Sequence, residues 1–188
     1  MKFPPALQPS QVTLLGYGAL LSEPSSRLTF PHLTNFRHVR VRGMRRVFGH
    51  PHLFLVGEGF ADPSETLKLA SLSAEPASND ISFVAAAFDV TLDDTQRTDF
   101  IRREPEYKIG TTEFYSLEDN AELAGEEGVI CLASRDVDLD PKMNTSGMES
   151  VWHWPHDSGL LPFNFYLRHC LLAVQSAGGV AYESFLQD

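Results

Sequence analysis

Glu104 is the residue whose position in this sequence most favours proton transfer. It lies at the end of a predicted helix, four residues beyond Phe100 and three beyond Ile101, so its carboxyl group shares their apolar face. A negative charge is unfavourable at a helix C-terminus and in an apolar environment, and both effects raise the pKa of a carboxyl group. Glu104 is therefore a candidate general acid and base near neutral pH.

Two alternatives to this interpretation stay open. Glu104 is a purely structural residue if it pairs with one of three nearby cations, Arg102, Arg103 or Lys108. Glu106 is a rival candidate for proton transfer, but it follows Pro105, and we expect its side chain to point outward. The position on the helix face is the reason for preferring Glu104.

The second candidate for chemistry is the backbone of a loop with the sequence Gly16-Tyr17-Gly18-Ala19-Leu20. The loop follows a predicted strand, and its small residues allow N–H groups to converge on an anion or on a polarised carbonyl oxygen. It is neither a dinucleotide fingerprint, which needs a third glycine at Leu21, nor a phosphate-binding P-loop, which needs Gly-Lys-Ser/Thr. An ordinary tight turn is the alternative.

The other clusters of reactive residue types favour structural roles. His50 with His52, and His153 with His156, lack a carboxylate or cysteine at the spacing of a known metal site, so we expect surface loops and no metal. We expect two reduced, buried thiols, Cys131 and Cys170. Five arginines are expected on the solvent face of one strand, pairing with acidic residues: Arg37, Arg40, Arg42, Arg45 and Arg46.

Hydrophobic periodicity predicts the elements that would position these residues. Strands are expected over residues 12–17, 37–48, 67–72, 83–91, 107–117 and 128–134. The strand over 83–91 is apolar on both faces and should be central. Thr91-Leu92-Asp93-Asp94 resembles a capping box that opens a helix ending before Pro105. A long ordered loop is expected over 136–159, followed by a helix over 163–177 that stops at Gly178 and Gly179.

Length and composition restrict the class of protein. We expect one domain over residues 1–188, because 43% apolar and 21% charged residues are typical of a chain with a packed core. The formal net charge of −10 disfavours nucleic acid as a partner, including an RNA-binding barrel that would use the arginine-rich strand. There is neither a signal peptide nor an apolar run of about 20 residues, so we expect no membrane partner and a cytoplasmic protein.

Four segments, in their order along the chain, resemble the gamma-glutamylcyclotransferase-like family, which includes the ChaC group. Residues 15–20 resemble its Tyr-Gly-Ser-Leu loop, with Ala19 in place of the serine, and residues 41–48 are similar to its Gly-aromatic-Arg-Arg segment, with Met44 in place of the aromatic residue. Residues 103–107, Arg-Glu-Pro-Glu-Tyr, resemble the segment that carries the family's catalytic glutamate, shortened by one residue. Residues 166–171 resemble a C-terminal helix of the family.

The resemblance implies an α+β fold, a small mixed β-barrel with flanking helices. It also implies a reaction without cofactor or metal, in which the α-amino group of a γ-glutamyl compound attacks its own γ-carbonyl group and releases 5-oxoproline. Glu104 would be the catalytic proton carrier, and five residues would bind the substrate: Tyr17, Gly18, Ala19, Leu20 and Tyr107.

Two functions from different classes stay open. The first is a cyclotransferase that acts on a small γ-glutamyl amine, a γ-glutamyl dipeptide or glutathione, and the core-facing Glu104 favours it. The second is a noncatalytic member of the same fold that binds a small metabolite or a protein partner, and the alanine at position 19 favours it. The sequence contains no signal for a particular oligomeric state.

Overall fold

The computed structural model describes residues 3–117, 125–141, 143, 145, 147–152, 154–155 and 157–187. His153 and His156 therefore lie outside the described residues. Within the described part of the chain, eight strands form one mixed sheet. The strands are β1 (Gln11–Gly16), β2 (Thr34–Arg42), β3 (Met44–Pro51), β4 (Lys68–Pro76), β5 (Ser82–Thr91), β6 (Lys108–Ser116), β7 (Glu126–Leu132) and β8 (Leu161–Pro162).

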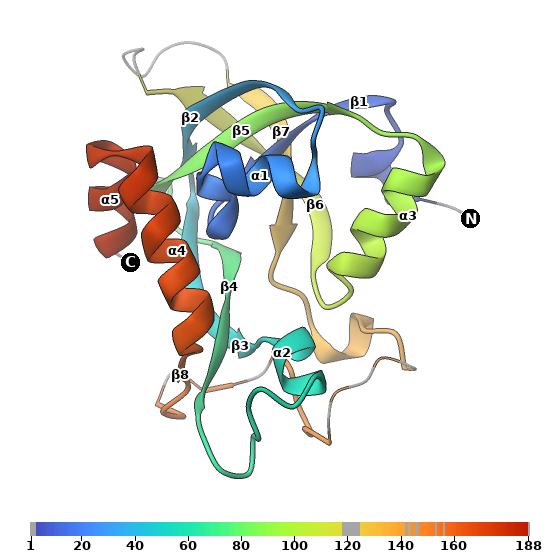
Figure 1. Cartoon of the computed structure of the whole chain (residues 1–188), viewed down its shortest axis with the longest axis vertical. Coiled ribbons are helices and arrows are strands. Elements are labelled where there is room, and N and C mark those ends of the chain that lie inside the picture. The colour runs from blue at the N-terminus through green and yellow to red at the C-terminus, as the bar shows by residue number, and fades with distance from the viewer. Residues whose placement is uncertain are drawn as a thin grey trace.

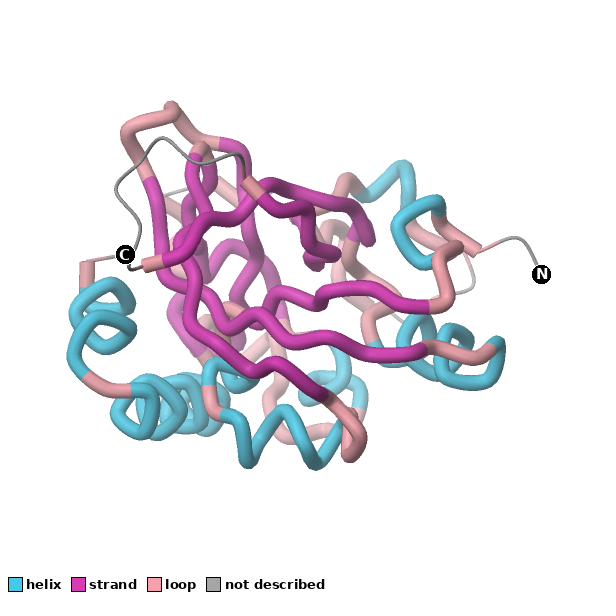
Figure 2. Tube along the Cα trace, turned by 90° about the horizontal axis from the view of Figure 1, so that it is seen from above, coloured by secondary structure: helices cyan, strands magenta, loops and turns pink. Residues whose placement is uncertain are grey.

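Helices surround this sheet, so the predicted α+β class is confirmed (Figures 1 and 2). Figure 1 shows α4 and α5 together on one side of the strands and α3 on the opposite side. No helix in the described ranges is long and apolar enough to cross a membrane. The helical segments are η1 (Pro5–Leu7), η2 (Ala19–Leu21), α1 (Glu23–Thr29), α2 (Leu53–Gly57), α3 (Asp94–Arg103), η3 (Asp136–Asp138), α4 (Asn164–Ala177) and α5 (Gly179–Leu186).

Strand β5 is central, as its apolar sequence predicts. The sheet order is β1-β5-β2-β6-β7-β4-β3, with β8 beside β4, and β5 pairs antiparallel with both β1 and β2. The six consecutive residues 83–88 of β5 are buried. Strand β1 also pairs in parallel with β7 through Leu14 and Val129, so the five strands β1, β5, β2, β6 and β7 are linked in a ring of pairings.

The single strand predicted over 37–48 is in fact two strands, because the chain turns at Gly43. This glycine has a φ of +67°, a left-handed conformation that side chains with a Cβ disfavour. Strand β2 pairs with β5 and β6, whereas β3 pairs with β4. The turn also shifts the alternation of buried residues, from Val39 and Val41 in β2 to Met44 and Arg46 in β3.

Arg46 is consequently the exception among the five arginines expected on a solvent face. It is only 3% exposed, because the shifted alternation turns its side chain inward. Arg37 and Arg45 behave as predicted, since they pair with the carboxylates of Glu126 and Glu75 at the sheet surface, at 3.2 and 3.1 Å.

Helix α3 begins two residues later than its predicted capping box. Asp93 is the N-cap residue, and its carboxylate accepts a hydrogen bond from the N–H of Gln96 at 2.8 Å while the Gln96 side chain accepts one from the N–H of Asp93 at 2.9 Å. Thr91 cannot cap the helix because it is the last residue of β5. The helix ends at Arg103, so Glu104 is its C-cap residue.

Two apolar clusters hold the helices in place. The first joins the sheet to α4 and α5 through Cys170, Val174 and Phe185. The second packs Phe100 of α3 against the sheet residues Phe88 and Val90. Because Phe100 is fixed in this cluster, the C-terminal end of α3 that carries Glu104 is held against the sheet.

The turn at Gly43 generates a prediction about stability. Replacing Gly43 with alanine places a Cβ at a φ of +67°, and we expect a loss of about 1–2 kcal/mol in the free energy of unfolding, measured by urea denaturation. Gly179→Ala is the control, since a Cβ there meets no atom within 4 Å and the residue lies at the start of α5. Equal stability of Gly43→Ala and the unchanged protein would contradict the role given to this turn.

Candidate active site

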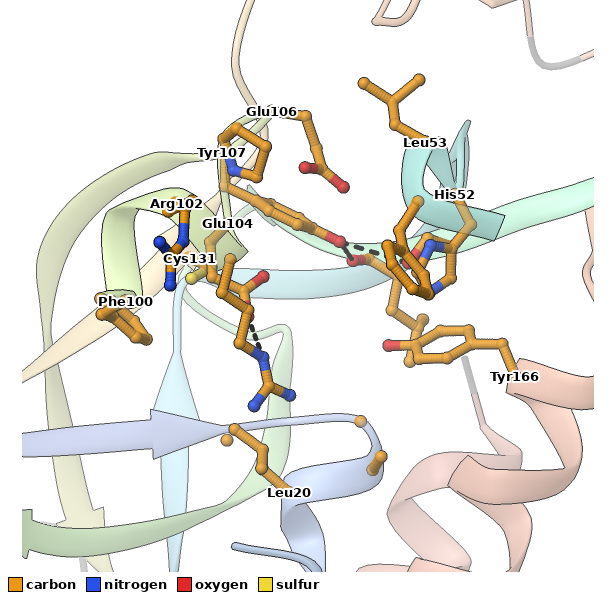
Figure 3. Close-up of a pocket in the computed structure, with 18 of the residues that line it drawn as sticks. Leu20, His52, Leu53, Phe100, Arg102, Glu104, Glu106, Tyr107, Cys131 and Tyr166 are labelled. Atoms are coloured by element: carbon orange, nitrogen blue, oxygen red, sulfur yellow. Dashed lines mark hydrogen bonds and ion pairs between the residues drawn. The ribbon is translucent and has the colours of Figure 1, made fainter. Parts of the chain in front are cut away.

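The residues selected from the sequence line one cavity of about 780 Å³, a size typical of small-molecule sites (Figure 3). The loop after β1, the end of α3 and the start of β6 contribute them, although these segments lie far apart in the chain. The predicted residues that line the cavity are Tyr17, Gly18, Ala19, Leu20, Glu104 and Tyr107. Residues from α2, β7 and α4 complete its walls.

The loop after β1 packs tightly against helix α4. A Cβ on Gly18 would lie 2.7 Å from the Tyr166 hydroxyl oxygen and 3.5 Å from the Cys170 sulfur, so a larger residue at this position would require the Tyr166 side chain to move. The N–H of Ala19 interacts with the Cys170 thiol and is therefore directed at the helix. No described residue accepts a hydrogen bond from the N–H of Gly18. Of the backbone N–H groups of Gly18 and Ala19, that of Gly18 is therefore the one available to an anion.

The two predicted substrate-binding tyrosines are anchored to the backbone of neighbouring strands. The Tyr17 hydroxyl donates to the carbonyl oxygen of Cys131 at 2.6 Å, and the Tyr107 hydroxyl donates to that of Leu72 at 2.8 Å. Burial raises the pKa of both phenols well above the usual value of 10, so both side chains are neutral. Each ring is thus a fixed wall of the cavity. The Tyr107 hydroxyl oxygen also lies 3.3 Å from the Ser71 hydroxyl, which can donate to it.

Glu104 combines the two properties that the sequence left as alternatives. Its carboxyl group lines the cavity, and burial raises its pKa from 4.5 to about 7. The same group pairs with Arg103, whose Nε lies 3.0 Å from Oε1, and this ion pair opposes the rise (Figure 3). The side chain of Glu104 is 19% exposed and that of Arg103 is 49% exposed, so the pair lies at the cavity wall and not in the core. The carboxyl group can therefore exchange protons near neutral pH.

Glu106 does not point outward as predicted. It is 6% exposed and lines the same cavity as Glu104. The chain makes a turn at residues 105 and 106 instead of continuing the helix, and the indole N–H of Trp152 donates to the carbonyl oxygen of Glu106 at 3.0 Å. Burial raises the pKa of Glu106 to about 7, and the nearby charge of Glu104 contributes to this rise.

The pair His50 and His52 is buried, and the expectation of a surface loop is wrong. His50 follows an irregularity between Phe48 and His50 in the pairing of β3 with β4, and its ring stacks on Trp152 with centroids 4.1 Å apart. Neither ring nitrogen of His50 has a hydrogen-bond partner within the described ranges, and burial lowers its pKa to about 3. His52 lines the cavity edge-on to Tyr166, and burial lowers its pKa to about 4. Both imidazoles are therefore neutral near pH 7.

The structure offers neither a metal site nor an activated thiol among the residues it describes. No group of three or more His, Cys, Asp or Glu side chains is arranged to hold a metal ion in the described ranges. Cys131 and Cys170 are both free, and burial raises the thiol pKa well above 9 for Cys131 and to about 12 for Cys170. Among the acidic residues of the cavity, Glu104 and Glu106 are the two whose pKa is raised by burial.

Sequence reasoning misplaced two polar lining residues, Glu106 and His52. No local signal predicted the burial of the neighbouring His50, because it follows an irregularity between Phe48 and His50 in the pairing of β3 with β4. No local signal existed for Glu106 either. Its direction is decided by the turn after Pro105 and by the contact with Trp152, which is 46 residues away in the chain.

Comparison with solved structures shows which fold this is. A yeast gamma-glutamyl cyclotransferase specific to glutathione superimposes on 95% of this chain and 97% of its own, with 13% sequence identity and a TM-score of 0.52. Its selenomethionine-labelled form gives a TM-score of 0.53 at 12% identity, over 95% of each chain. No protein-family model and no curated protein sequence matches this chain. The protein thus has a gamma-glutamyl cyclotransferase-like fold.

The raised pKa of Glu106 predicts a pH-dependent effect on stability. Below pH 4.5 the carboxyl group is protonated in both states, and between pH 4.5 and about 7 the unfolded chain loses its proton first, so stability falls as pH rises. Glutamine does not titrate. The free energy of unfolding of Glu106→Gln minus that of the unchanged protein should therefore increase by about 1–3 kcal/mol from pH 4.5 to pH 8.

Urea denaturation of both proteins at the two pH values measures this gain. Glu183→Gln is the matched control, because Glu183 is an exposed residue on α5. Its difference from the unchanged protein should be the same at both pH values. A constant difference for Glu106→Gln as well would show that this carboxyl group is not buried in solution.

Proposed function

We propose that this protein is a γ-glutamyl cyclotransferase, which converts a small γ-glutamyl compound into 5-oxoproline and a free amine. The observation that carries the proposal is the position of Glu104: a carboxyl group with a pKa of about 7, in one cavity with the loop Tyr17–Leu20. The gamma-glutamyl cyclotransferase-like fold supports the same reaction.

Glu104 carries the proton in this mechanism. Its carboxylate takes a proton from the α-ammonium group of the substrate, and the neutral amine nitrogen then attacks the γ-carbonyl carbon. A new carbon–nitrogen bond closes the five-membered ring. Glu104 returns this proton to the leaving nitrogen as the original amide bond breaks, and the second proton of the attacking nitrogen passes to the released amine, which leaves as an ammonium group. Because the attack is intramolecular, the protein has only to hold the substrate in a folded conformation.

The loop after β1 supplies the electrostatic part of the mechanism. The N–H of Gly18 has no acceptor among the described residues, so it is available to the substrate carboxylate or to the oxyanion that forms on the carbonyl oxygen. The hydroxyl oxygens of Tyr17 and Tyr107 can accept hydrogen bonds from the substrate ammonium group. Arg103 holds the Glu104 carboxylate at the cavity wall and limits the rise of its pKa. None of these roles requires a metal or a cofactor.

One observation favours the alternative function, a noncatalytic protein that binds a small metabolite in the same cavity. Residue 19 is an alanine, and its N–H faces Cys170 and not the cavity, so the loop offers fewer donors to an oxyanion. A purified protein that binds γ-glutamyl compounds but releases no 5-oxoproline from a broad panel would establish this alternative.

The proposed role of Glu104 predicts a large loss of activity in Glu104→Gln. The amide keeps the size of the side chain but cannot exchange protons, so turnover should fall by about 10²- to 10⁴-fold. The measurement is the rate of 5-oxoproline release from γ-glutamyl amines, γ-glutamyl dipeptides and glutathione.

Two further variants make this result interpretable. Glu183→Gln, on the exposed surface of α5, controls for the general effect of the substitution and should retain full turnover. Glu106→Gln separates the two carboxyl groups of the cavity. If Glu106→Gln loses turnover on every substrate while Glu104→Gln keeps it, the proton carrier is Glu106 and our assignment is wrong.

A further inference from the structure

The cavity contains more negative than positive groups among its described lining residues. Four acidic and two basic residues line it: Glu58, Asp99, Glu104, Glu106, Arg102 and Arg103. Both arginines are already paired within the lining, since Arg102 lies 2.7 Å from Asp99 and Arg103 lies 3.0 Å from Glu104. The described lining therefore holds no unpaired cation, and His52 is neutral because burial lowers its pKa.

Glu106 is the buried member of this set that has no partner. It is 94% buried, and its carboxyl group interacts with its own backbone N–H but with no cation or donor of another described residue. In Figure 3 the carboxyl group of Glu106 points into the cavity, toward the side on which His52 and Leu53 lie. A buried carboxyl group without a partner is unfavourable, and a cation bound beside it would relieve this cost.

We propose that Glu106 forms a cation-binding subsite, and that the protein acts on γ-glutamyl compounds whose leaving group carries a second, positively charged amine. This inference rests on the proposed cyclotransferase function. Figure 3 shows the carboxyl group of Glu104 between Leu20 and Glu106. A substrate whose glutamyl part lies at the loop and whose amide bond lies at Glu104 extends its leaving group toward Glu106.

The same charges disfavour a leaving group that ends in a carboxylate. Such a group would approach the carboxyl group of Glu106 and would find no unpaired arginine or lysine among the described lining residues. Like charges in a cavity of low polarity repel strongly. Glutathione, whose leaving group is cysteinylglycine, belongs to this disfavoured class.

Three γ-glutamyl amides of nearly equal length test the subsite. They are the conjugates of 1,4-diaminobutane, n-pentylamine and 4-aminobutyrate, whose far ends are positive, neutral and negative. For the unchanged protein, kcat/KM for 5-oxoproline release should be at least about tenfold higher for the diaminobutane conjugate than for the pentylamine conjugate, since tenfold corresponds to about 1.4 kcal/mol. The 4-aminobutyrate conjugate should be the poorest substrate.

Glu106→Gln should remove this preference. Its kcat/KM for the diaminobutane conjugate should fall to within about threefold of its own kcat/KM for the pentylamine conjugate. Glu183→Gln is the control and should keep the original ratio, because Glu183 lies on the exposed surface of α5. Equal use of the two conjugates by the unchanged protein, or an unaltered ratio in Glu106→Gln, would overturn the subsite.

A binding measurement separates the subsite from the proposed function. Calorimetric titration gives the Kd of the diaminobutane and pentylamine conjugates for the unchanged protein and for Glu106→Gln without requiring turnover. One outcome is that no conjugate releases 5-oxoproline, while the diaminobutane conjugate binds the unchanged protein about tenfold more tightly than the pentylamine conjugate does, and Glu106→Gln removes this difference. The subsite then stands and the cyclotransferase function fails. If binding shows no such preference, the subsite fails whatever the activity.

Discussion

The buried guanidinium group of Arg46 is the constraint on which the position of the site depends. It lies between the rings of Phe83 and Phe185, 5.1 and 4.9 Å from their centroids. It donates to the carbonyl oxygens of Val84 and Tyr17 and to the hydroxyl of Ser184, at 3.3, 3.5 and 3.1 Å. A buried charge is tolerated only where such partners surround it. Arg46 therefore fixes four parts of the structure relative to one another: strand β3, strand β5, helix α5 and Tyr17 of the cavity loop.

A second contact sets the other wall of the cavity. Gly18 lies so close to Tyr166 and Cys170 that the loop and helix α4 share one surface. The loop is thus held from two sides, by Arg46 from the sheet and by α4 from the helical layer. This rigidity suits a site that must present one backbone N–H to a small anion, because fixed dipoles need no reorganisation when the ligand charge develops.

The two carboxyl groups of the cavity differ in their partners, and this difference separates their roles. Glu104 lies beside Arg103 at the end of α3, where an ion pair holds a carboxylate that can lose and regain its proton. Glu106 lies two residues further along, beyond the turn, with no cation beside it among the described residues. Burial raises the pKa of both groups, and such perturbed pairs are typical of functional sites. His52, which is neutral near pH 7 because burial lowers its pKa, lines the same cavity.

The sequence alone determined the order of the elements and the position of the main candidate residue. Apolar runs predicted the central strand β5, and helical spacing predicted α4, because these signals come from residues close together in the chain. The apolar face of α3 placed Glu104 on the core side, and its cavity position follows from that face. Tertiary structure decided what depends on distant contacts. The turn at Gly43 reversed the alternation of β3 and buried Arg46, and an irregularity in the pairing of β3 with β4 precedes the buried His50. The turn after Pro105, held by Trp152, directed Glu106 inward. A local pattern cannot contain these outcomes, because the groups that fix them lie in other strands and in a loop 46 residues away.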